Sequence, residues 1–437
     1  MNLIELRKKL IEQNIKPLRN PKEVEEVKPI ECKIIGITGS VGKSSTAFIL
    51  HSYLKSIGLR SILYSSIVVD SKYSIINGSS KDVPILNKSE LLTIVNEAIM
   101  YDAQYLILEI NEATIEKGII DDVIFDVKLL TNINPRHNLE QYSEEEYVNL
   151  KKSFFNDENS QHIYCYTGYE KRILEELLLI NNKNLVVSTN YVIDKYNIRE
   201  DIIGCKLNEL YNEYDGLRIE FELFKEKYAL KTNLHFNYNA FNILNVVSIL
   251  ECLKIYNNES FNKSLQNIEI PGRSILLNKN GRSIIIDQSL IGLDNHIRDG
   301  QKIKVVTGFV GSGYKGFDER YKTKEYIEKL IVSHIETAKM LNEIASFVYY
   351  TSQDEGKLSL DELYKNVLPY FDNEKTMLIK NRIRALDYAL MNLEAGETLY
   401  ISGMGNKKTM CITENEMVYF DEIEYVKKRL KEMEWEK

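Results

Sequence analysis

The sequence predicts an α/β protein with two sheet-containing domains, the second smaller than the first. From residue 32 onward, apolar segments of strand length alternate with helical segments, which is typical of a parallel sheet covered by helices. A Pro271-Gly272 pair interrupts this alternation and marks a boundary. The 437 residues, 44% of them hydrophobic, suffice for two or three domains with their own cores. We therefore expect a short helix and connector over 1–30, a central domain over 31–270 and a C-terminal α/β domain over 271–437.

The first thirty residues are too few for a domain. A helix is expected from Leu3 to Gln13, and a polar, proline-containing connector follows it.

The central domain is predicted to begin with buried strands, each followed by a helix. The strands are expected at Ile34–Thr38, Ser61–Ser65, Tyr105–Ile110 and Val127–Asn132, and the helices at Ser44–Ser56 and Ser89–Met100. Asn87 and Glu90 have the spacing of a capping motif at the start of the second helix. The pattern then becomes strand-rich between Gln161 and Leu234, and a helix is expected from Asn239 to Leu253.

Strands and helices alternate again in the C-terminal part, which predicts a smaller, Rossmann-like α/β domain. Its strands are expected at Ser283–Asp287, Lys304–Phe309, Ser346–Thr351, Thr376–Lys380 and Thr398–Ser402, and its helices at Thr323–Leu341 and Asn381–Leu393.

A glycine-rich turn joins the first strand of the central domain to its first helix. The turn reads Thr38-Gly39-Ser40-Val41-Gly42-Lys43-Ser44-Ser45. Backbone N–H groups at a helix N-terminus bind phosphate, and glycines let the backbone approach closely. In such a P-loop, Lys43 reaches the β- and γ-phosphates and Ser44 holds Mg²⁺. Ile37 stands five residues before Gly42, so the turn fits Thr-Gly-x-x-Gly-Lys-Ser and not the common spacing of four residues between glycines.

Glu109 ends a strand of four apolar or aromatic residues. A carboxylate at the C-terminal end of a strand in a P-loop domain stands where Mg²⁺ needs a ligand. The alternative is a solvated glutamate at a strand end, and the apolar residues before it favour the metal role.

A turn with a histidine follows the next buried strand, from Thr131 to His137, and leads to a helix with a capping box at Ser143. His137 is a candidate metal ligand or phosphate contact, although a lone histidine is more often structural. Lys151 stands four residues after Tyr147 beside the apolar stripe of that helix, so it points either inward or into solvent next to Lys152.

Together these segments resemble the Mur ligase family of ATP-dependent amide-bond ligases, most closely the branch that adds the third residue of the muramoyl peptide. The resemblance covers 31–437, and its motifs occur in the family's order. They are Thr38–Ser44, Leu108-Glu109, Thr131–His137, Tyr147-x-x-x-Lys151, Asn239-Ala-Phe-Asn242, Ile270-Pro-Gly-Arg273, Asp287 and Ser402-Gly-Met-Gly405.

The resemblance implies a role for each matching position. Ser44 and Glu109 would hold a first Mg²⁺, while His137 and a carbamylated Lys151 would hold a second. Asn242 would contact adenine, and Arg273 and Asp287 would act on the nucleotide. The cofactors implied are ATP and Mg²⁺. The reaction implied joins a carboxylate to an amine or amino acid through an acyl-phosphate and releases ADP and phosphate, with Lys43, His137 and Lys151 as catalytic residues.

Several positions depart from the family's pattern. The family's first, UDP-sugar-binding domain is expected to be missing or reduced to the first thirty residues. The other departures are Arg136 for Asp, Asn111-Glu112 for Ser-Ser, Leu290 and Gly292 for His and Pro, Gln353–Gly356 for Asp-Asn-Pro-Arg, and Met404 and Asn406 for Lys and His. From these we expect an acid substrate, free or carrier-bound, that is not a UDP-muramoyl peptide.

Composition limits the class of protein. A formal net charge of −8 argues against a general nucleic-acid-binding surface. The chain shows no signal peptide and no apolar run of membrane-spanning length, so a cytoplasmic protein is expected. Two alternatives stay open at this point, a P-loop kinase or ATPase and a nucleotide-binding subunit of a partner enzyme.

Overall fold

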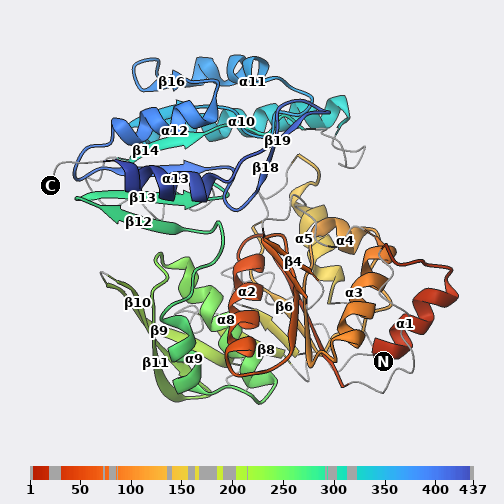
Figure 1. Cartoon of the computed structure of the whole chain (residues 1–437). Coiled ribbons are helices and arrows are strands. Elements are labelled where there is room, and N and C mark those ends of the chain that lie inside the picture. Colours follow the sequence, from red (N-terminus) through yellow and green to blue (C-terminus); the bar gives the residue numbers. More distant parts are fainter. Residues whose placement is uncertain are drawn as a thin grey trace. The chain divides into compact units, whose positions relative to one another are not determined.

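A computed structural model gives the structure of this protein (Figure 1) and describes residues 3–18, 31–71, 74–77, 85, 87–134, 140–155, 163–166, 185–189, 203–213, 215–290, 293, 303–312 and 322–433. The chain divides into two compact units. Unit 1 comprises Met1–His137 with Ser143–Glu269, and unit 2 comprises Asn138–Tyr142 with Ile270–Lys437.

Unit 1 is built on a sheet in which 11 strands are described, in the order β11-β10-β9-β8-β7-β6-β1-β5-β2-β3-β4. The strands are β1 (Lys33–Thr38), β2 (Ser61–Tyr64), β3 (Val68–Ser71), β4 (Ser74–Asn77), β5 (Tyr105–Glu109), β6 (Val127–Leu130), β7 (Ile163–Tyr166), β8 (Leu185–Thr189), β9 (Ile203–Glu213), β10 (Gly216–Leu223) and β11 (Glu226–Thr232).

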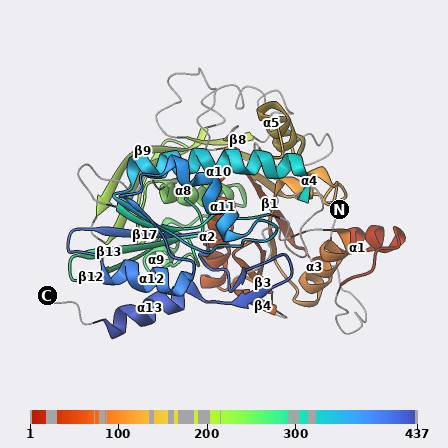
Figure 2. The ribbon, with the colours of Figure 1, turned by 90° about the horizontal axis from the view of Figure 1, so that it is seen from above.

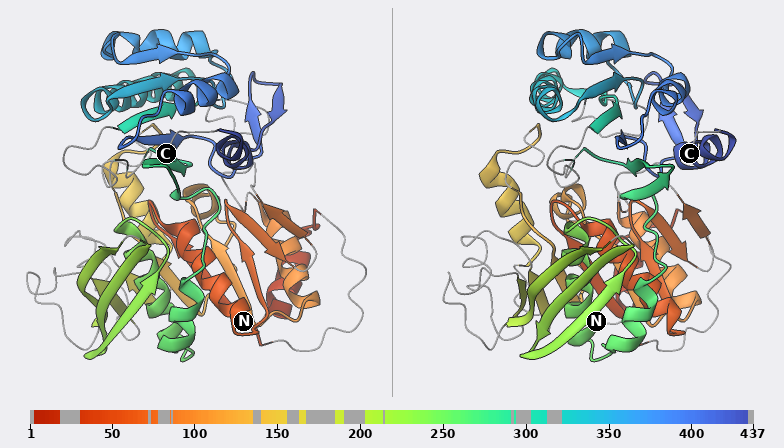
Figure 3. Two further views of the ribbon diagram at one scale, coloured as in Figure 1. Left: turned by 60° about the vertical axis from the view of Figure 1, so that its left-hand side comes forward. Right: turned by 90° about the vertical axis from the view of Figure 1, so that its left-hand side faces the viewer.

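The predicted parallel sheet is confirmed for the centre of unit 1 and needs correction at both edges. The strands from β9 to β2 all pair in parallel. At one edge β9, β10 and β11 form an antiparallel meander, which both views of Figure 3 show in green, and at the other β2, β3 and β4 pair antiparallel. The meander's central strand alternates between buried apolar and partly exposed polar residues, as expected for a sheet with one wet face.

The helices of unit 1 cover the sheet through apolar residues. Those within the described residues are α1 (Leu3–Glu12), α2 (Lys43–Ser56), α3 (Lys88–Met100), α4 (Glu112–Glu116), α5 (Glu144–Ser153), α8 (Tyr238–Cys252) and α9 (Asn258–Leu265). Helix α2 packs against α8, and α1 packs against α3. The predicted capping box of α5 is confirmed, because the Ser143 side chain accepts from the Glu146 N–H and the Glu146 carboxylate accepts from the Ser143 N–H.

The described strands of unit 2 form one sheet of six, in the order β12-β13-β17-β14-β15-β16, and a separate two-stranded ribbon, β18 with β19. Among the described strands of the larger sheet, β12 alone runs antiparallel. The strands are β12 (Ile275–Lys279), β13 (Arg282–Asp287), β14 (Ile303–Thr307), β15 (Phe347–Tyr350), β16 (Thr376–Leu378), β17 (Thr398–Ser402), β18 (Thr409–Cys411) and β19 (Met417–Tyr419). The helices are α10 (Lys324–Ile344), α11 (Leu360–Val367), α12 (Arg382–Met391) and α13 (Glu422–Glu432).

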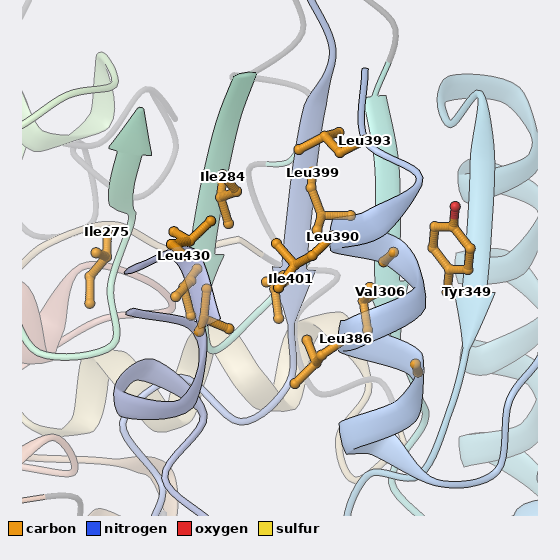
Figure 4. Packing of buried hydrophobic residues seen from close by; sticks show 14 of the residues in the cluster. Ile275, Ile284, Val306, Tyr349, Leu386, Leu390, Leu393, Leu399, Ile401 and Leu430 are labelled. Carbon is orange, nitrogen blue, oxygen red and sulfur yellow. The ribbon is translucent and has the colours of Figure 1, made fainter. Parts of the chain in front are cut away.

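Helices lie on both faces of this sheet. Figure 2 shows α10 on one side of the strands and α12 with α13 on the other. Leu386 and Leu390 of α12 pack against Leu399 and Ile401 of β17 in a fully buried cluster (Figure 4). The predicted α/β fold of this part is therefore confirmed, including the β17 bounds.

Arg382 and Glu422 form a buried ion pair in unit 2. The Arg382 guanidinium donates to the Glu422 carboxylate, with an Nε–Oε2 distance of 2.6 Å, and both side chains are essentially inaccessible to solvent. Arg382 also donates to the backbone carbonyls of Ser352 and Ser402, so it ties its own helix to three other segments.

None of the described helices combines the length and the apolarity that a membrane span requires.

Candidate functional site

The glycine-rich turn follows the carboxyl end of β1, a central strand of the unit 1 sheet. It lies between the carboxyl ends of the two neighbouring strands, β5 and β6. Strand β1 pairs in parallel with β5 on one side and β6 on the other, with Ile37 opposite Glu109 and Thr38 opposite Leu130. Because the carboxyl ends of parallel strands meet at the same edge, the turn, Glu109 and the segment after β6 converge there.

Two glycines give the turn its shape. Gly39 has a φ of +142° and Gly42 a φ of +83°, both in the region that favours glycine. A Cβ on Gly39 would lie 2.0 Å from Thr131 Oγ1, and one on Gly42 would lie 2.5 Å from Asn242 Oδ1. Neither position has room for a side chain, so the backbone can be approached closely only because both residues are glycine.

The segment after β6 holds the turn in place. The Ser40 and Val41 N–H groups donate to the backbone and side-chain oxygens of Asn132, at 3.0 and 3.1 Å. In return the Thr131 hydroxyl and the Asn132 amide donate to the Val41 carbonyl, at 2.6 and 2.9 Å. The sequence singled out Thr131 and Asn132 only as part of a motif, and the structure shows that they support the loop.

Lys43, the first residue of α2, directs its ammonium back to the turn. Its Nζ donates to the carbonyls of Gly39 at 2.8 Å and Ser40 at 3.1 Å. The lysine therefore lies against the loop that it is predicted to serve.

Ser44 and Glu109 meet as the sequence predicts. The Ser44 hydroxyl donates to Glu109 Oε1 at 3.0 Å, and Ser45 beside it is also buried. The Ser66 N–H donates to Glu109 Oε2 at 2.8 Å, and the Ser66 hydroxyl lies 3.0 Å from Ser44 Oγ. Glu109 is only 3% exposed, so the alternative of a solvated glutamate is wrong. Sequence reasoning missed Ser66, because nothing in the β2–β3 turn marks it.

Lys151 points inward, and the alternative of a surface lysine is wrong. Its side chain is 0% exposed, and its Nζ lies 2.7 Å from Glu112 Oε1 and 3.0 Å from Thr38 Oγ1. The Thr38 hydroxyl in turn donates to the Ile110 carbonyl at 2.8 Å. The sequence treated Glu112 only as a departure from a family pattern, whereas the structure pairs it with the buried lysine.

The ionisation of this pair follows from its surroundings. Burial lowers the pKa of the Lys151 ammonium to about 8, and nearby Lys43 adds to that fall while Glu112 opposes it. Burial acts to raise the pKa of Glu112, but the charges of Lys151 and Lys43 outweigh it and hold that pKa well below the usual range. Glu112 is therefore an anion at neutral pH, with a cation beside it.

Tyr147 connects the Lys151–Glu112 pair to Ser40 in the glycine-rich turn. Its hydroxyl donates to Glu112 Oε1 at 3.1 Å and lies 2.9 Å from Ser40 Oγ. Ser40 Oγ also accepts from the Asn134 N–H at 2.8 Å. Tyr147 was predicted only as part of the buried stripe of its helix, and its polar end was missed because periodicity shows the face of a residue and not its partner.

Asn242, predicted to contact adenine, lies in α8 where that helix faces α2. Its Oδ1 accepts from the Thr46 hydroxyl at 3.4 Å, and its Nδ2 donates to Asn239 Oδ1 at 3.0 Å. Asn242 Oδ1 also lies 2.5 Å from where a Cβ on Gly42 would stand, and the contact of Asn242 with a base remains a prediction.

Arg273 and Asp287 both lie in unit 2. Arg273 Nη1 is 3.9 Å from Asp287 Oδ1, and Asp287 also accepts from the N–H and hydroxyl of Ser274, both at 2.9 Å. Burial raises the pKa of Asp287, although Arg273 and the hydrogen bonds oppose the shift. Their contact with a nucleotide remains a prediction. His137 lies outside the described residues, so its predicted role as a metal ligand also remains untested.

Comparisons of the sequence and of the structure with known proteins point to the same family. Residues 37–250 match the family model described as the Mur ligase middle domain. A UDP-N-acetylmuramoyl-L-alanyl-D-glutamate–2,6-diaminopimelate ligase from Helicobacter pylori is 26% identical over 411 residues, which are 90% of this chain and 83% of that protein.

Two solved structures have a similar fold. One is a UDP-N-acetylmuramoylalanyl-D-glutamyl-2,6-diaminopimelate–D-alanyl-D-alanyl ligase from Acinetobacter baumannii, with a TM-score of 0.59 at 14% identity over 92% of this chain and 76% of that one. The other is a bifunctional folylpolyglutamate synthase/dihydrofolate synthase with Mn, AMPPNP and L-glutamate bound, with a TM-score of 0.57 at 15% identity over 93% and 92%. With the converging loop, Glu109 and β6 segment described above, these matches confirm the resemblance to the Mur ligase family and identify residues 37–250 with its middle domain.

Proposed function

We propose that this protein is an ATP-dependent ligase that forms an amide bond between a carboxylate and an amine or amino acid. The carboxylate is activated as an acyl-phosphate, the amine displaces the phosphate, and ADP and phosphate are released. One observation carries the proposal. Lys43, Ser44 and Glu109 lie together at the carboxyl ends of the central strands, where the glycine-rich turn leads into α2.

The turn supplies what a polyphosphate needs. Its N–H groups stand at the N-terminus of a 14-residue helix, where partial positive charge favours an anion. Gly39 and Gly42 give the turn a backbone conformation that other residues rarely adopt, and Lys43 adds a full positive charge. Charge spreads over the transferring phosphoryl group in the transition state, so fixed cations and N–H groups around it lower the barrier.

The donor set beside the turn fits a magnesium ion. Mg²⁺ prefers hard oxygen ligands, and Ser44 Oγ and Glu109 Oε1 provide a hydroxyl and a carboxylate 3.0 Å apart. These two residues would hold the ion, which would neutralise charge on the phosphate oxygens. Ser66 keeps the Glu109 carboxylate oriented through its N–H.

The identity of the acid is the finer part of the proposal. The relatives are named for UDP-N-acetylmuramoyl peptides, and the solved folylpolyglutamate synthase is named for a different acid. The expectation of an acid other than a UDP-muramoyl peptide gains no support from these names. Both classes of acid therefore belong in the substrate test, which decides between them.

The test is phosphate release from Mg-ATP by the purified protein, with a panel of acids crossed against a panel of amino acids and amines. We expect turnover only when an acid and an amine are both present, with a product whose mass shows loss of one water. Lys43→Ala should abolish it, whereas the exposed Lys254→Ala, on the same unit, should not. Phosphate release that no pair stimulates would refute the ligase and favour an ATPase.

A further inference from the structure

The Arg382 guanidinium connects the loops that follow two strands of the unit 2 sheet. Arg382 is the first residue of α12, and its side chain is buried together with that of Glu422. Its Nη1 donates to the Ser352 carbonyl at 3.1 Å, just after β15, and its Nη2 donates to the Ser402 carbonyl at 2.6 Å, at the end of β17. Strand β14 lies between these two strands in the sheet. One side chain therefore joins the carboxyl ends of strands that do not pair with each other.

A glutamine brings the loop after β14 into the same arrangement. Gln353, next to Ser352, accepts from the Gly308 N–H through its Oε1 at 3.2 Å, and Gly308 follows β14 directly. A Cβ on Gly403, the residue after Ser402, would lie 2.0 Å from the same oxygen. Gly403 also has a φ of +114°, which favours glycine. The loops after β14, β15 and β17 thus meet around the Gln353 amide.

Asp354 connects the same loops through its backbone and its carboxylate. Its carbonyl accepts from the Gly311 N–H at 2.9 Å, in the loop after β14. Its Oδ1 accepts from the Cys411 N–H at 3.0 Å, and its Oδ2 lies 2.9 Å from Lys407 Nζ, both in the chain that follows β17. Because each loop is hydrogen-bonded to the others, a shift at the end of β15 or β17 would displace all three.

The buried ion pair between Arg382 and Glu422 is not arranged for the greatest stability. Burial of two charges costs free energy, which their attraction repays only when their remaining polar atoms are paired as well. Glu422 Oε1 has no hydrogen-bond partner in the described part of the chain. Apolar residues in place of such a pair often leave a protein as stable as before. What they cannot replace is the planar guanidinium that donates to two carbonyls at once.

The carboxyl ends of these strands are also where open α/β sheets bind ligands. In unit 1 the corresponding strand ends carry the glycine-rich turn, which serves the phosphates in the proposed function. In unit 2 the loops carry side chains of both charges, Asp354 and Glu355 beside Lys407. An amino acid has an ammonium and a carboxylate of its own, so it is the substrate of the proposed reaction that matches charges of both signs.

We propose that Arg382 is a positioning residue that holds the loops after β14, β15 and β17 in the arrangement that receives the incoming amine or amino acid. The proposal rests on the proposed function, because it takes the substrate from that reaction. Arg382 itself touches no substrate. It acts through the Ser352 and Ser402 carbonyls, which fix the points where two of the loops begin.

Hydrogen exchange followed by mass spectrometry tests the positioning without turnover. The double variant Arg382→Met/Glu422→Leu removes both charges together and so avoids an unpaired buried carboxylate. We expect peptides that cover 308–311 and 352–358 to exchange at least about tenfold faster than in the unchanged protein, while peptides of α10 keep their rates. The control is Arg384→Met, which changes an exposed arginine on the same helix and should alter no rate. Unchanged exchange of the loops in the folded double variant would overturn the positioning role.

Steady-state kinetics test the connection to the amine. With the acid and amine found by the ligase test, the double variant should raise the KM for the amine at least about tenfold, while the KM for ATP stays within twofold. Arg382→Lys keeps the charge opposite Glu422 but lacks the planar fork, so its KM should fall between the two. It also serves alone if the double variant does not fold. A merely structural role would reduce the amount of folded enzyme, and with it kcat, without a change in either KM. An unaltered KM for the amine in these variants would refute the proposal.

The outcomes are separable from those of the ligase test. Exchange rates need no substrate, so faster exchange of the loops would support the positioning by Arg382 even if no acid and amine pair were found. The amine as the ligand would then fall together with the proposed function. Conversely, active variants with an unaltered KM for the amine would remove this inference and leave the proposed ligase untouched.

Discussion

Substitution of Gly39 by alanine tests whether the shape of the phosphate loop determines nucleotide binding. The new Cβ would lie 2.0 Å from Thr131 Oγ1 and 3.0 and 3.1 Å from the backbone O and N of Asn132. Thr131 would have to move and lose its 2.6 Å hydrogen bond to the Val41 carbonyl, which contributes about 1 kcal/mol. The φ of +142° adds about 1–3 kcal/mol of backbone strain.

Together these effects come to about 2–4 kcal/mol. Since 1.4 kcal/mol is a factor of ten, the affinity for ADP with Mg²⁺ should fall by roughly 30- to 1,000-fold. Isothermal titration calorimetry measures this directly. Gly58→Ala is the matched control, because Gly58 also has a positive φ of +82° but a Cβ there would meet no atom within 4 Å. If Gly39→Ala binds ADP within threefold of the unchanged protein, the loop does not hold the phosphates in this conformation.

Three further predictions follow from other parts of the chain. Arg382→Met should destabilise unit 2 by about 3–5 kcal/mol, because it leaves Glu422 buried without its partner, and adding Glu422→Leu should recover most of that loss in denaturant unfolding. Burial lowers the pKa of His334 to about 4 from an ordinary 6.5, so the unfolded state binds more protons between these values. Stability should be complete above pH 6.5 and fall by about 3 kcal/mol as the pH drops to 4, and His334→Phe should flatten this dependence in thermal melts. Glu109→Gln should raise the Mg²⁺ concentration required for phosphate release about tenfold or more, whereas Glu116→Gln should leave it unchanged; equal Mg²⁺ dependence of the two variants would exclude Glu109 as the ligand.

The local signals in the sequence predicted the elements well where both the pattern and the turn chemistry were strong. The glycine turn, the Ser143 capping box and the buried strand before Glu109 are of this kind, because each depends on neighbouring residues alone. The antiparallel edges of the unit 1 sheet were not predicted, because strand direction depends on pairing with distant residues. A four-residue strand such as Val68–Ser71 carries no sign of its partner in its own sequence.

The same distinction between local signals and distant contacts applies to the residues of the candidate site. Lys43, Ser44 and Glu109 stand at positions that a motif fixes, and they converge in the structure. Glu112 and Ser66 were not predicted as site residues, because their importance comes from Lys151 and Glu109, which lie on other elements. A buried lysine that requires a counter-charge is the signal that could have directed attention to Glu112.

The two hydrogen bonds of Lys43 to its own loop have a consequence for how a ligand would enter. The ammonium already has two carbonyl acceptors, on Gly39 and Ser40, so the loop is shaped and the lysine immobilised before any phosphate arrives. A phosphate oxygen would replace one acceptor by another, with little change in the number of hydrogen bonds. Binding of a phosphate then exchanges hydrogen-bond acceptors of a lysine that is already ordered. The conformational entropy of the Lys43 side chain is lost during folding and not at the moment of binding.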